Sequence, residues 1–491
     1  MPHHIDSKAV ADFRGMKKTP DPVASPLNRR EALQRAACGF GHVALLGLLT
    51  EQSRAETTAT NLLSAKPPHF TAKAKRIIFL FMHGGVSHVD TFDPKPELAK
   101  RNGQPLPIAK PKFEFAPTGN LLASPWKFAK HGQSGVEVSE LFPEIGSVID
   151  DICVIRSMNG ADQVSHGPAL LNMNTGSGVF ARPSLGAWTL FGLGTENQNL
   201  PGFISLAPSL YHGGAQNYGS AFLPASFQGT RIGDGSTPFQ QAALSNLKPG
   251  DDPSLQRLQL NLIAQRNREH LARVGDDPRL EARIAAFEMS FRMQMEAPRV
   301  MDLSQESEAT RKLYGVGEEP TDEYGRECLL ARRCVESGVR FVQANFSYPR
   351  NYWDAHGDLR NNHSSNAKKV DKPIAGLLRD LKSRGLLDDT LVIFGTEFGR
   401  TPAAQGNDGR DHHPHAFSIW MAGGGVRGGM THGRTDEFGY YVAANKVTMP
   451  DFHATILHLL GFDHTQLTFR HAGRDHRLTD VDGEVVTDIL A

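Results

Sequence analysis

The chain has 491 residues, of which 39% are hydrophobic and 22% charged, the composition of a globular protein large enough for one or two domains. Basic and acidic residues both number 53, and the resulting net charge of zero gives no reason to expect nucleic acid or an anionic membrane as a partner. The 21 histidines exceed what we expect for this length, and because histidine is the commonest metal ligand, their positions bear on function.

The N-terminal region has the pattern of an export signal. Arg29 and Arg30 precede an apolar stretch of small residues, 36–49, which is typical of a twin-arginine signal and too short to span a bilayer. We therefore expect residues 1–55 to be a twin-arginine signal region and the protein to be exported to the periplasm, with no membrane span in its mature part. An amphipathic helix with an arginine pair is the alternative. The polar residues 56–74 are predicted to be a linker.

From residue 75 onward, short apolar runs alternate with helical patterns. Strands are predicted at 76–82, 152–156, 203–206, 339–343, 391–394 and 417–421, and helices at 167–174, 370–386 and 451–460. Apolar residues recur at helical spacing over 253–297, and we predict a helical insertion over about 250–315. Strands alternating with helices indicate an α/β fold with a doubly wound, mostly parallel sheet.

Polar residues suited to metal binding follow several of these strands. In a doubly wound sheet, ligands bind beyond the carboxyl ends of the strands. Five groups of candidates fall at such points: His83, His88, Asp90 and Asp93; Asp162, Ser165 and His166; Asp354, His356 and Asp358; Glu397 and Arg400; Asp411, His412, His413 and His415. One such histidine is more often structural, but five groups in register are hard to explain that way. Imidazoles mixed with carboxylates suit zinc, manganese or iron, and calcium less well.

Two of these candidates have an ordinary structural interpretation as well. Asp90 can cap a turn. Arg400 can hold an anionic substrate group by a two-point contact, or it can form an ordinary surface salt bridge.

The four cysteines predict neither a disulfide framework nor a zinc knuckle. Cys38 lies in the predicted signal region, so three remain and at least one of them is unpaired. Cys328 and Cys334 lie on a predicted helix at a spacing that points them to different faces. We expect the remaining cysteines to be small buried hydrophobic residues.

The segment 370–394 resembles the helix and strand that precede the metal-binding Asp-His pair of sulfatases. The first strand with its glycine loop, and the helix that ends at Thr175-Gly176, are also similar to the alkaline phosphatase and sulfatase superfamily. The resemblance is closer to a large bacterial family of exported, sulfatase-related proteins of unknown function. It is carried by the arginine signal, His83-Gly-Gly, Trp353-Asp-Ala-His356, Thr396-Glu-Phe-Gly-Arg-Thr-Pro402 and Gly409-Arg-Asp-His-His-Pro414. It covers roughly 28–491 and implies an alkaline-phosphatase-like domain over 75–491 with two metal sites.

The ligand pattern that this resemblance implies is matched in part. The aspartate ligand after the first strand corresponds to His83, and the Asp-His pair corresponds to Glu397 and Phe398, so that one ligand is lost. The third histidine corresponds to His412 or His413. The aspartate and histidine of the other metal site map to Asp354 and His356.

The nucleophile is the main departure from the superfamily. That residue lies nine positions before a Thr-Gly pair, which here is the position of His166, with Ser165 beside it. A histidine there can ligate metal, act as a base or act as a nucleophile. The ester hydrolysis that uses serine, threonine or cysteine is therefore not expected in its usual form.

The resemblance, together with the ligand groups that are retained, implies a hydrolase of sulfate or phosphate esters, with those of polysaccharides as one candidate class, that depends on a divalent metal: zinc first, with manganese, iron or calcium as alternatives. The catalytic candidates are His166 and Arg400, and the metal candidates are His83, His166, Asp354, His356, Glu397, His412 and His413, with Asp90, Asp411 and Ser165 as further candidates. The expected partner is an anionic ester or a sulfated glycan. The alternatives are a non-catalytic metal- or glycan-binding protein on a degenerate sulfatase fold, and a metal-dependent mutase or lyase.

Overall fold

The computed structural model describes residues 62–109, 117–242, 252–274 and 278–491, and the predicted signal region lies outside them. At the centre of this part of the chain is a nine-stranded sheet in the order β12-β4-β11-β8-β1-β7-β5-β6, with β15 also paired to β4. The strands are β1 Arg76–Met82, β4 Ile152–Asn159, β5 Phe203–Leu206, β6 Thr230–Ile232, β7 Phe341–Phe346, β8 Thr390–Gly395, β11 Phe417–Ala422, β12 Met430–His432 and β15 Val447–Thr448.

The sheet is mixed but mostly parallel. β1 pairs in parallel with β7 and β8, and β5 with β6 and β7, whereas β11 runs antiparallel to β4 and β8. This confirms the α/β fold predicted from the alternation of strands and helices. Because β1, β7 and β8 are parallel neighbours, their carboxyl ends meet at one edge of the sheet, where the candidate ligands were expected.

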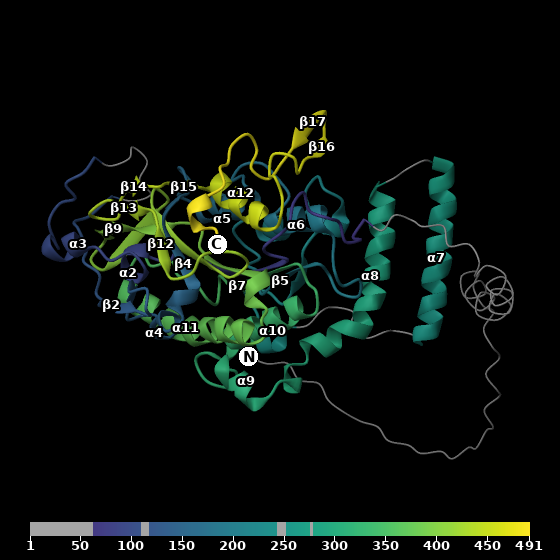
Figure 1. Ribbon diagram of the computed structural model, residues 1–491, viewed down its shortest axis with the longest axis horizontal. Coiled ribbons are helices and arrows are strands. Elements are labelled where there is room, and N and C mark those ends of the chain that lie inside the picture. Colours follow the sequence, from purple (N-terminus) through teal and green to yellow (C-terminus); the bar gives the residue numbers. More distant parts are fainter. Residues whose placement is uncertain (1–61, 110–116, 243–251, 275–277) are drawn as a thin grey trace, which may run out of the picture. The chain divides into compact units, whose positions relative to one another are not determined.

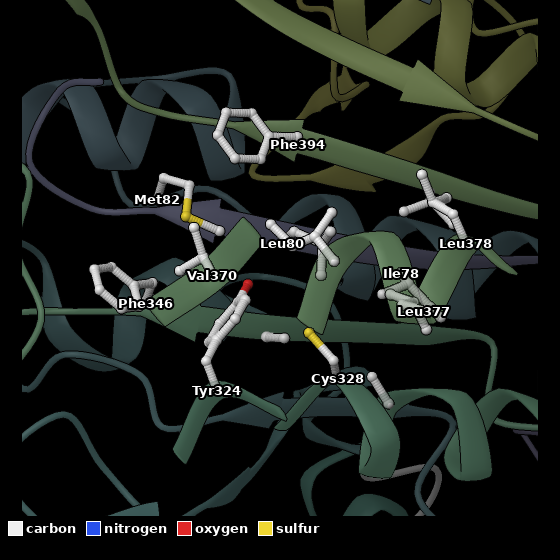
Figure 2. Packing of buried hydrophobic residues seen from close by; sticks show 14 of the residues in the cluster. Ile78, Leu80, Met82, Tyr324, Cys328, Phe346, Val370, Leu377, Leu378 and Phe394 are labelled. Carbon is white, nitrogen blue, oxygen red and sulfur yellow. The ribbon is translucent and has the colours of Figure 1, made fainter. Parts of the chain in front are cut away.

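Helices cover both faces of the sheet, and β1 shows why its sequence is apolar throughout. The side chains of Ile78, Leu80 and Met82 pack with α10 (Asp322–Glu336) and α11 (Leu359–Ser383). Figure 2 shows them beside Tyr324, Cys328, Val370, Leu377 and Leu378. The alternate residues Ile77, Phe79 and Phe81 pack on the other face with α5 (His166–Thr175), α6 (Leu185–Leu193) and α12 (Met449–Leu459). A strand that is buried on both faces needs apolar residues at every position.

Two long helices, α7 (Pro253–Val274) and α8 (Pro278–Met301), occupy the range predicted as a helical insertion. They pack on each other, and α8 also packs on α10 (Figure 1). In the part of the chain that the structure describes, no helix is both long enough and apolar enough to span a membrane. Cys153, Cys328 and Cys334 are buried and unpaired, as expected.

Among the elements that the sequence did not predict, one hairpin lies close to the candidate ligands, and one predicted helix is longer than expected. A hairpin of β9 (Gly399–Gln405) and β10 (Gly409–His413) follows β8 and lies beyond its carboxyl end. Helix α11 begins at Leu359 rather than at residue 370, because its first turns are polar and show no apolar period. The hairpin turns out to carry part of the site.

Candidate metal centre

Most of the predicted ligands converge at the carboxyl edge of the sheet. The side chains come from the ends of β1 and β8, the loop between β7 and α11, the first residue of α5 and strand β10. Three overlapping groups bring their ligand atoms within 4.8 Å of one another: His83, His166 and Glu397; His166, Asp354 and His412; His356, Asp411 and His412. Two of the groups share His166, and two share His412, so the three form one continuous cluster.

The innermost group surrounds Glu397. Its Oε1 atom accepts hydrogen bonds from His166 Nδ1 at 2.7 Å and from the Gly84 N–H at 2.8 Å, and it lies 3.9 Å from His83 Nε2. Burial raises the pKa of Glu397, but the hydrogen bond from His166 and the nearby imidazoles outweigh it and set the pKa at about 2. Burial lowers the pKa of His83 to about 4. The carboxylate is therefore ionised and the His83 imidazole neutral, the forms that bind metal.

Asp354 connects the other two groups. Its Oδ1 atom lies 3.1 Å from His356 Nε2 and 3.2 Å from His412 Nε2, and its Oδ2 atom lies 3.5 Å from His166 Nε2. Burial opposes ionisation of Asp354, but hydrogen bonds to the three histidines hold its pKa well below the usual range. The Nε2 atoms of His356 and His412 are only 3.0 Å apart, and Asp411 Oδ1 lies 3.8 Å from His356 Nδ1.

The chemistry and spacing of these donors fit divalent metal ions. Bonds of about 2.0–2.2 Å in tetrahedral geometry place donor atoms roughly 3.3–3.6 Å apart. The separations within the cluster run from 2.7 to 3.9 Å, on both sides of that value. Among the ion pairs of the described residues, the buried Glu397 pairs with His83 and His166 rather than with a lysine or arginine. A buried carboxylate needs a compensating cation, which a metal would supply.

His166 is held through both of its ring nitrogens. Nδ1 bonds Glu397, while Nε2 lies 2.8 Å from the Tyr352 hydroxyl. Burial lowers the pKa of His166, but its hydrogen bonds and charge interactions with Asp354 and Glu397 raise it overall. Both nitrogens therefore have partners, and any of the three expected roles of His166, as ligand, base or nucleophile, requires one of these hydrogen bonds to be exchanged. Ser165 is the exposed N-cap residue of α5, and no hydrogen bond among the described residues joins its hydroxyl to the cluster.

Arg400 is buried beneath the cluster instead of facing a substrate. Its guanidinium donates to the carbonyl oxygens of Gly84, Gly85 and Arg410 and to the carboxylate of Asp354. The residue is 0% exposed. This burial argues against the expected two-point contact with an anionic substrate, and the arginine instead positions Asp354 and the glycine loop after β1.

The structure does not bring His413 or Asp90 into the cluster. A β-bulge in β10 interrupts the alternation of side chains, so that Asp411 and His412 both face the cluster while His413 points away. His413 Nε2 bonds the carbonyl of Tyr440 at 2.6 Å, and burial lowers its pKa well below the usual range. The carboxylate of Asp90 forms a fully buried ion pair with Arg410 at 2.7 Å, which removes it from metal binding.

Two site residues were missed by the sequence analysis. His212 Nδ1 lies 2.9 Å from His83 Nε2, and burial lowers the pKa of His212, which keeps it neutral. Its φ of 52° is unusual for a residue other than glycine, and such backbone conformations cluster at functional sites. His212 follows the predicted strand 203–206, so the strand-end rule that found the others also applies to it. Tyr352 has no comparable signal, because its role depends on its contact with His166.

Comparison with known proteins gives a family and a set of distant structural relatives. The family described as "Protein of unknown function (DUF1501)" matches residues 74–490. None of the curated proteins matches the chain. Similar solved structures include the lipoteichoic acid synthase LtaP from Listeria monocytogenes, at 11% identity over 86% of this chain and 78% of that chain, with a TM-score of 0.36.

Two further structures belong to the same set. A protein in the alkaline phosphatase superfamily from Vibrio parahaemolyticus is 11% identical over 86% of this chain and 75% of that chain, with a TM-score of 0.33. The alkaline phosphatase from the Antarctic bacterium TAB5 is 10% identical over 80% of this chain and 99% of that chain, also with a TM-score of 0.33. Likeness of this degree says nothing about the reaction, which has to be argued from the residues of this chain.

Proposed function

The chain belongs to the family described as protein of unknown function (DUF1501), and from the ligand cluster around His166 we propose that it is a metal-dependent hydrolase of phosphate or sulfate esters. The observation that supports this most is the convergence of three overlapping groups of imidazoles and carboxylates at one edge of a mostly parallel sheet. The cluster contains three carboxylates and one guanidinium, and this excess of negative groups attracts cations.

The groups suggest two metal positions. One would be held by His83, His166 and Glu397, and the other by Asp354, His356 and His412 with Asp411 beside them. We propose zinc because imidazole and carboxylate donors at this spacing suit it, with manganese, iron or calcium as alternatives. When bound, such an ion polarises the oxygens of a phosphoryl or sulfuryl group and stabilises the charge that develops as the ester bond breaks.

Tyr352 is placed to hold the imidazole of His166, the candidate base, in the cluster. Burial and the negative charge of Asp354 raise the pKa of Tyr352 above its usual range, so its hydroxyl stays protonated and can donate to His166 Nε2. The side chains of His356 and Asp354 are 30% and 15% exposed, whereas that of Glu397 is 0% exposed. Substrate would therefore approach from the side of Asp354 and His356.

The proposed substrate is an anionic ester, with sulfated glycans included in the class. His166 is the first residue of the ten-residue helix α5, so the positive end of the helix dipole lies at the cluster and favours an anion there. The arginine pair at 29–30, followed by an apolar stretch, supports export to the periplasm, where such substrates would be met. The balanced charge gives no support for a nucleic-acid partner.

A non-catalytic metal- or glycan-binding protein is the second candidate. It is favoured by one observation, namely that the position expected for the nucleophile holds His166 and that both of its ring nitrogens already have partners. A protein of this kind would bind metal and an anionic ligand but would not turn over esters. Fold alone does not decide between the two functions.

The test begins with metal content. The exported protein is purified, its bound metal is measured by mass spectrometry, and hydrolysis of 4-nitrophenyl phosphate and 4-nitrophenyl sulfate is followed. We expect about one or two equivalents of zinc, manganese or iron, with turnover of at least one ester. Metal without turnover would support the metal-binding protein, whereas absence of metal after reconstitution would refute the hydrolase and leave only a glycan-binding protein.

A matched pair of variants assigns the metal to the cluster. Glu397→Gln removes the buried carboxylate and should lose at least one equivalent of metal. Glu327→Gln is the control, because Glu327 is also buried but lies in helix α10, outside the ligand groups. Burial raises the pKa of Glu327 well above its usual range, so this substitution removes no charge.

A further inference from the structure

A row of aromatic rings leads from His166 to the protein surface. The ring centroids of His166 and Tyr352 are 5.4 Å apart, those of Tyr352 and Tyr348 are 4.9 Å apart, and those of Tyr348 and Tyr211 are 5.3 Å apart. His212 packs against the inner half of the row, 5.1 Å from His166 and 5.5 Å from Tyr348. The row therefore begins at the proposed metal centre and ends in solvent.

The inner end of this aromatic row is fixed by hydrogen bonds. Apart from His166, which begins α5, its residues come from two loops, one after β5 and one after β7, and these strands are paired in the sheet. The hydroxyl of Ser347 donates to the Ala207 carbonyl at 2.6 Å and joins the two loops. The backbone N–H of Tyr348 donates to His83 Nδ1 at 3.3 Å, which ties the second loop to the ligand cluster.

The outer end of the aromatic row is exposed to solvent, and the described fold does not depend on it. Tyr211 is 53% exposed and its neighbour Leu210 is 49% exposed. No hydrogen bond within the described residues uses the hydroxyl of Tyr211 or Tyr348, so these side chains offer ring surface rather than polar anchors. A lone exposed tyrosine is ordinary, but this one extends a packed row that starts at a catalytic candidate.

The charges around the row suit a neutral ligand. Arg350, in the same loop as Tyr348, is paired with Glu323 at 2.9 Å. A second anionic group on the ligand would therefore find no unpaired arginine in that loop. Ring surface without charge is what recognises the apolar face of another ring.

We propose that Tyr348 and Tyr211 form a subsite for a neutral, ring-shaped leaving group of the ester. This inference rests on the proposed function, because the anionic end of the same molecule would lie at the metal centre. The ligand class is an ester whose leaving group carries a flat ring face, as an arene or a sugar does. Tyr348 and Tyr211 set which esters are preferred and take no part in breaking the bond.

The test uses phosphonates, whose carbon–phosphorus bond is not hydrolysed, so that binding is measured without turnover. Phenylphosphonate, cyclohexylphosphonate and methylphosphonate are titrated into the metal-loaded protein by calorimetry. We expect the two ring compounds to bind about tenfold more tightly than methylphosphonate. A preference for phenyl over cyclohexyl would indicate an arene, and equal binding would indicate a saturated ring such as a sugar.

Variants connect that preference to the row. The double substitution Tyr211→Ala and Tyr348→Ala should reduce the preference for ring phosphonates over methylphosphonate to about threefold or less. The double substitution of the same residues by phenylalanine keeps both rings and should keep the preference, which serves as the control for misfolding. Phe70→Ala is the matched control, because Phe70 is an exposed aromatic residue (39%) that precedes the opposite end of β1.

The outcomes separate this proposal from the hydrolase proposal. Equal binding of all three phosphonates, failure of any to bind, or a ring preference that survives the double alanine substitution would overturn the subsite. A ring preference with no hydrolysis of phenyl phosphate or phenyl sulfate would leave the subsite standing and refute the hydrolase.

Discussion

Replacing Asp90 by asparagine tests what holds the hairpin that carries Asp411 and His412. Asp90 accepts hydrogen bonds from Arg410 Nε at 2.7 Å and from Nη2 at 3.1 Å, and both side chains are fully buried. Burial disfavours the charged form of Asp90, but the guanidinium outweighs it and lowers the pKa, so the pair is ionic. Asparagine keeps the shape and one acceptor oxygen but leaves the buried guanidinium of Arg410 without a counter-ion.

The expected cost follows from that uncompensated charge. Removing one partner of a buried pair costs about 3–5 kcal/mol, and the remaining amide oxygen places this variant at about 3 kcal/mol. The unfolding entropy of the unit Asn61–Ala491 is about 0.9 kcal/mol per kelvin at roughly 2 cal/mol/K per residue, which predicts a decrease in Tm of about 3–4 °C. The double variant Asp90→Leu, Arg410→Met removes both charges and should regain at least half of the loss.

The assay is calorimetric unfolding at pH 7 with chelator present, so that metal binding does not contribute. Asp475→Asn is the control, because Asp475 pairs with Arg470 on the surface, with side chains 56% and 68% exposed, and its loss should change Tm by less than about 1 °C. A shift for Asp90→Asn no larger than that of the control, or a double variant less stable than the single one, would refute the reasoning.

Three further predictions concern other parts of the molecule. With free metal at a hundred times its dissociation constant, binding stabilises the folded protein by about 2.7 kcal/mol, so removing the metal by chelation should lower Tm by about 3 °C. A calorimetric scan with and without added zinc checks this. Equal Tm values would contradict a metal site in the native state. Burial raises the pKa of Asp371 to about 6, so the folded protein keeps this proton while the unfolded chain loses it, and stability should fall by about 3 kcal/mol between roughly pH 4 and pH 7. Urea unfolding of the wild type and of Asp371→Asn at both pH values checks this. The free energy of unfolding of the variant should lack the decrease of about 3 kcal/mol that is attributed to Asp371. Burial raises the pKa of the thiols of Cys153, Cys328 and Cys334, so iodoacetamide at pH 8 should leave all three unmodified until the protein is unfolded, as read by mass spectrometry of peptides.

The fold was predictable from the sequence where burial decides the residue type. Strands such as β1 and β8 are buried on both faces, and their unbroken apolar runs leave little alternative. The β9–β10 hairpin could not be found in this way, because its segments are polar and lack alternation. Its hydrogen-bonded ladder and buried partners stabilise it, and these exist only in three dimensions.

The site residues also divide into those that the sequence could predict and those that depend on the three-dimensional fold. His83, Glu397 and Asp354 follow strands, and the rule that ligands gather at strand ends was enough to group them. Side-chain direction was beyond that rule, since only the β-bulge explains why His412 faces the cluster and His413 does not. The burial of Arg400 was equally hidden, because it depends on the carbonyl oxygens that surround it.

The central place of β1 in the sheet has a consequence for how the protein is made. Its partners β7 and β8 begin only at Phe341 and Thr390, late in the chain. At about 5–20 residues per second, the roughly 300 residues that separate β1 from β8 take on the order of 15–60 s to synthesise. Until β7 is made both edges of this apolar strand lack their partners, and one edge still lacks its partner until β8 is made, which is the condition in which nascent chains aggregate or are bound by chaperones. Residues on both sides of that gap form the candidate metal centre, so no ribosome-bound fragment that stops short of β10 can contain all of its residues.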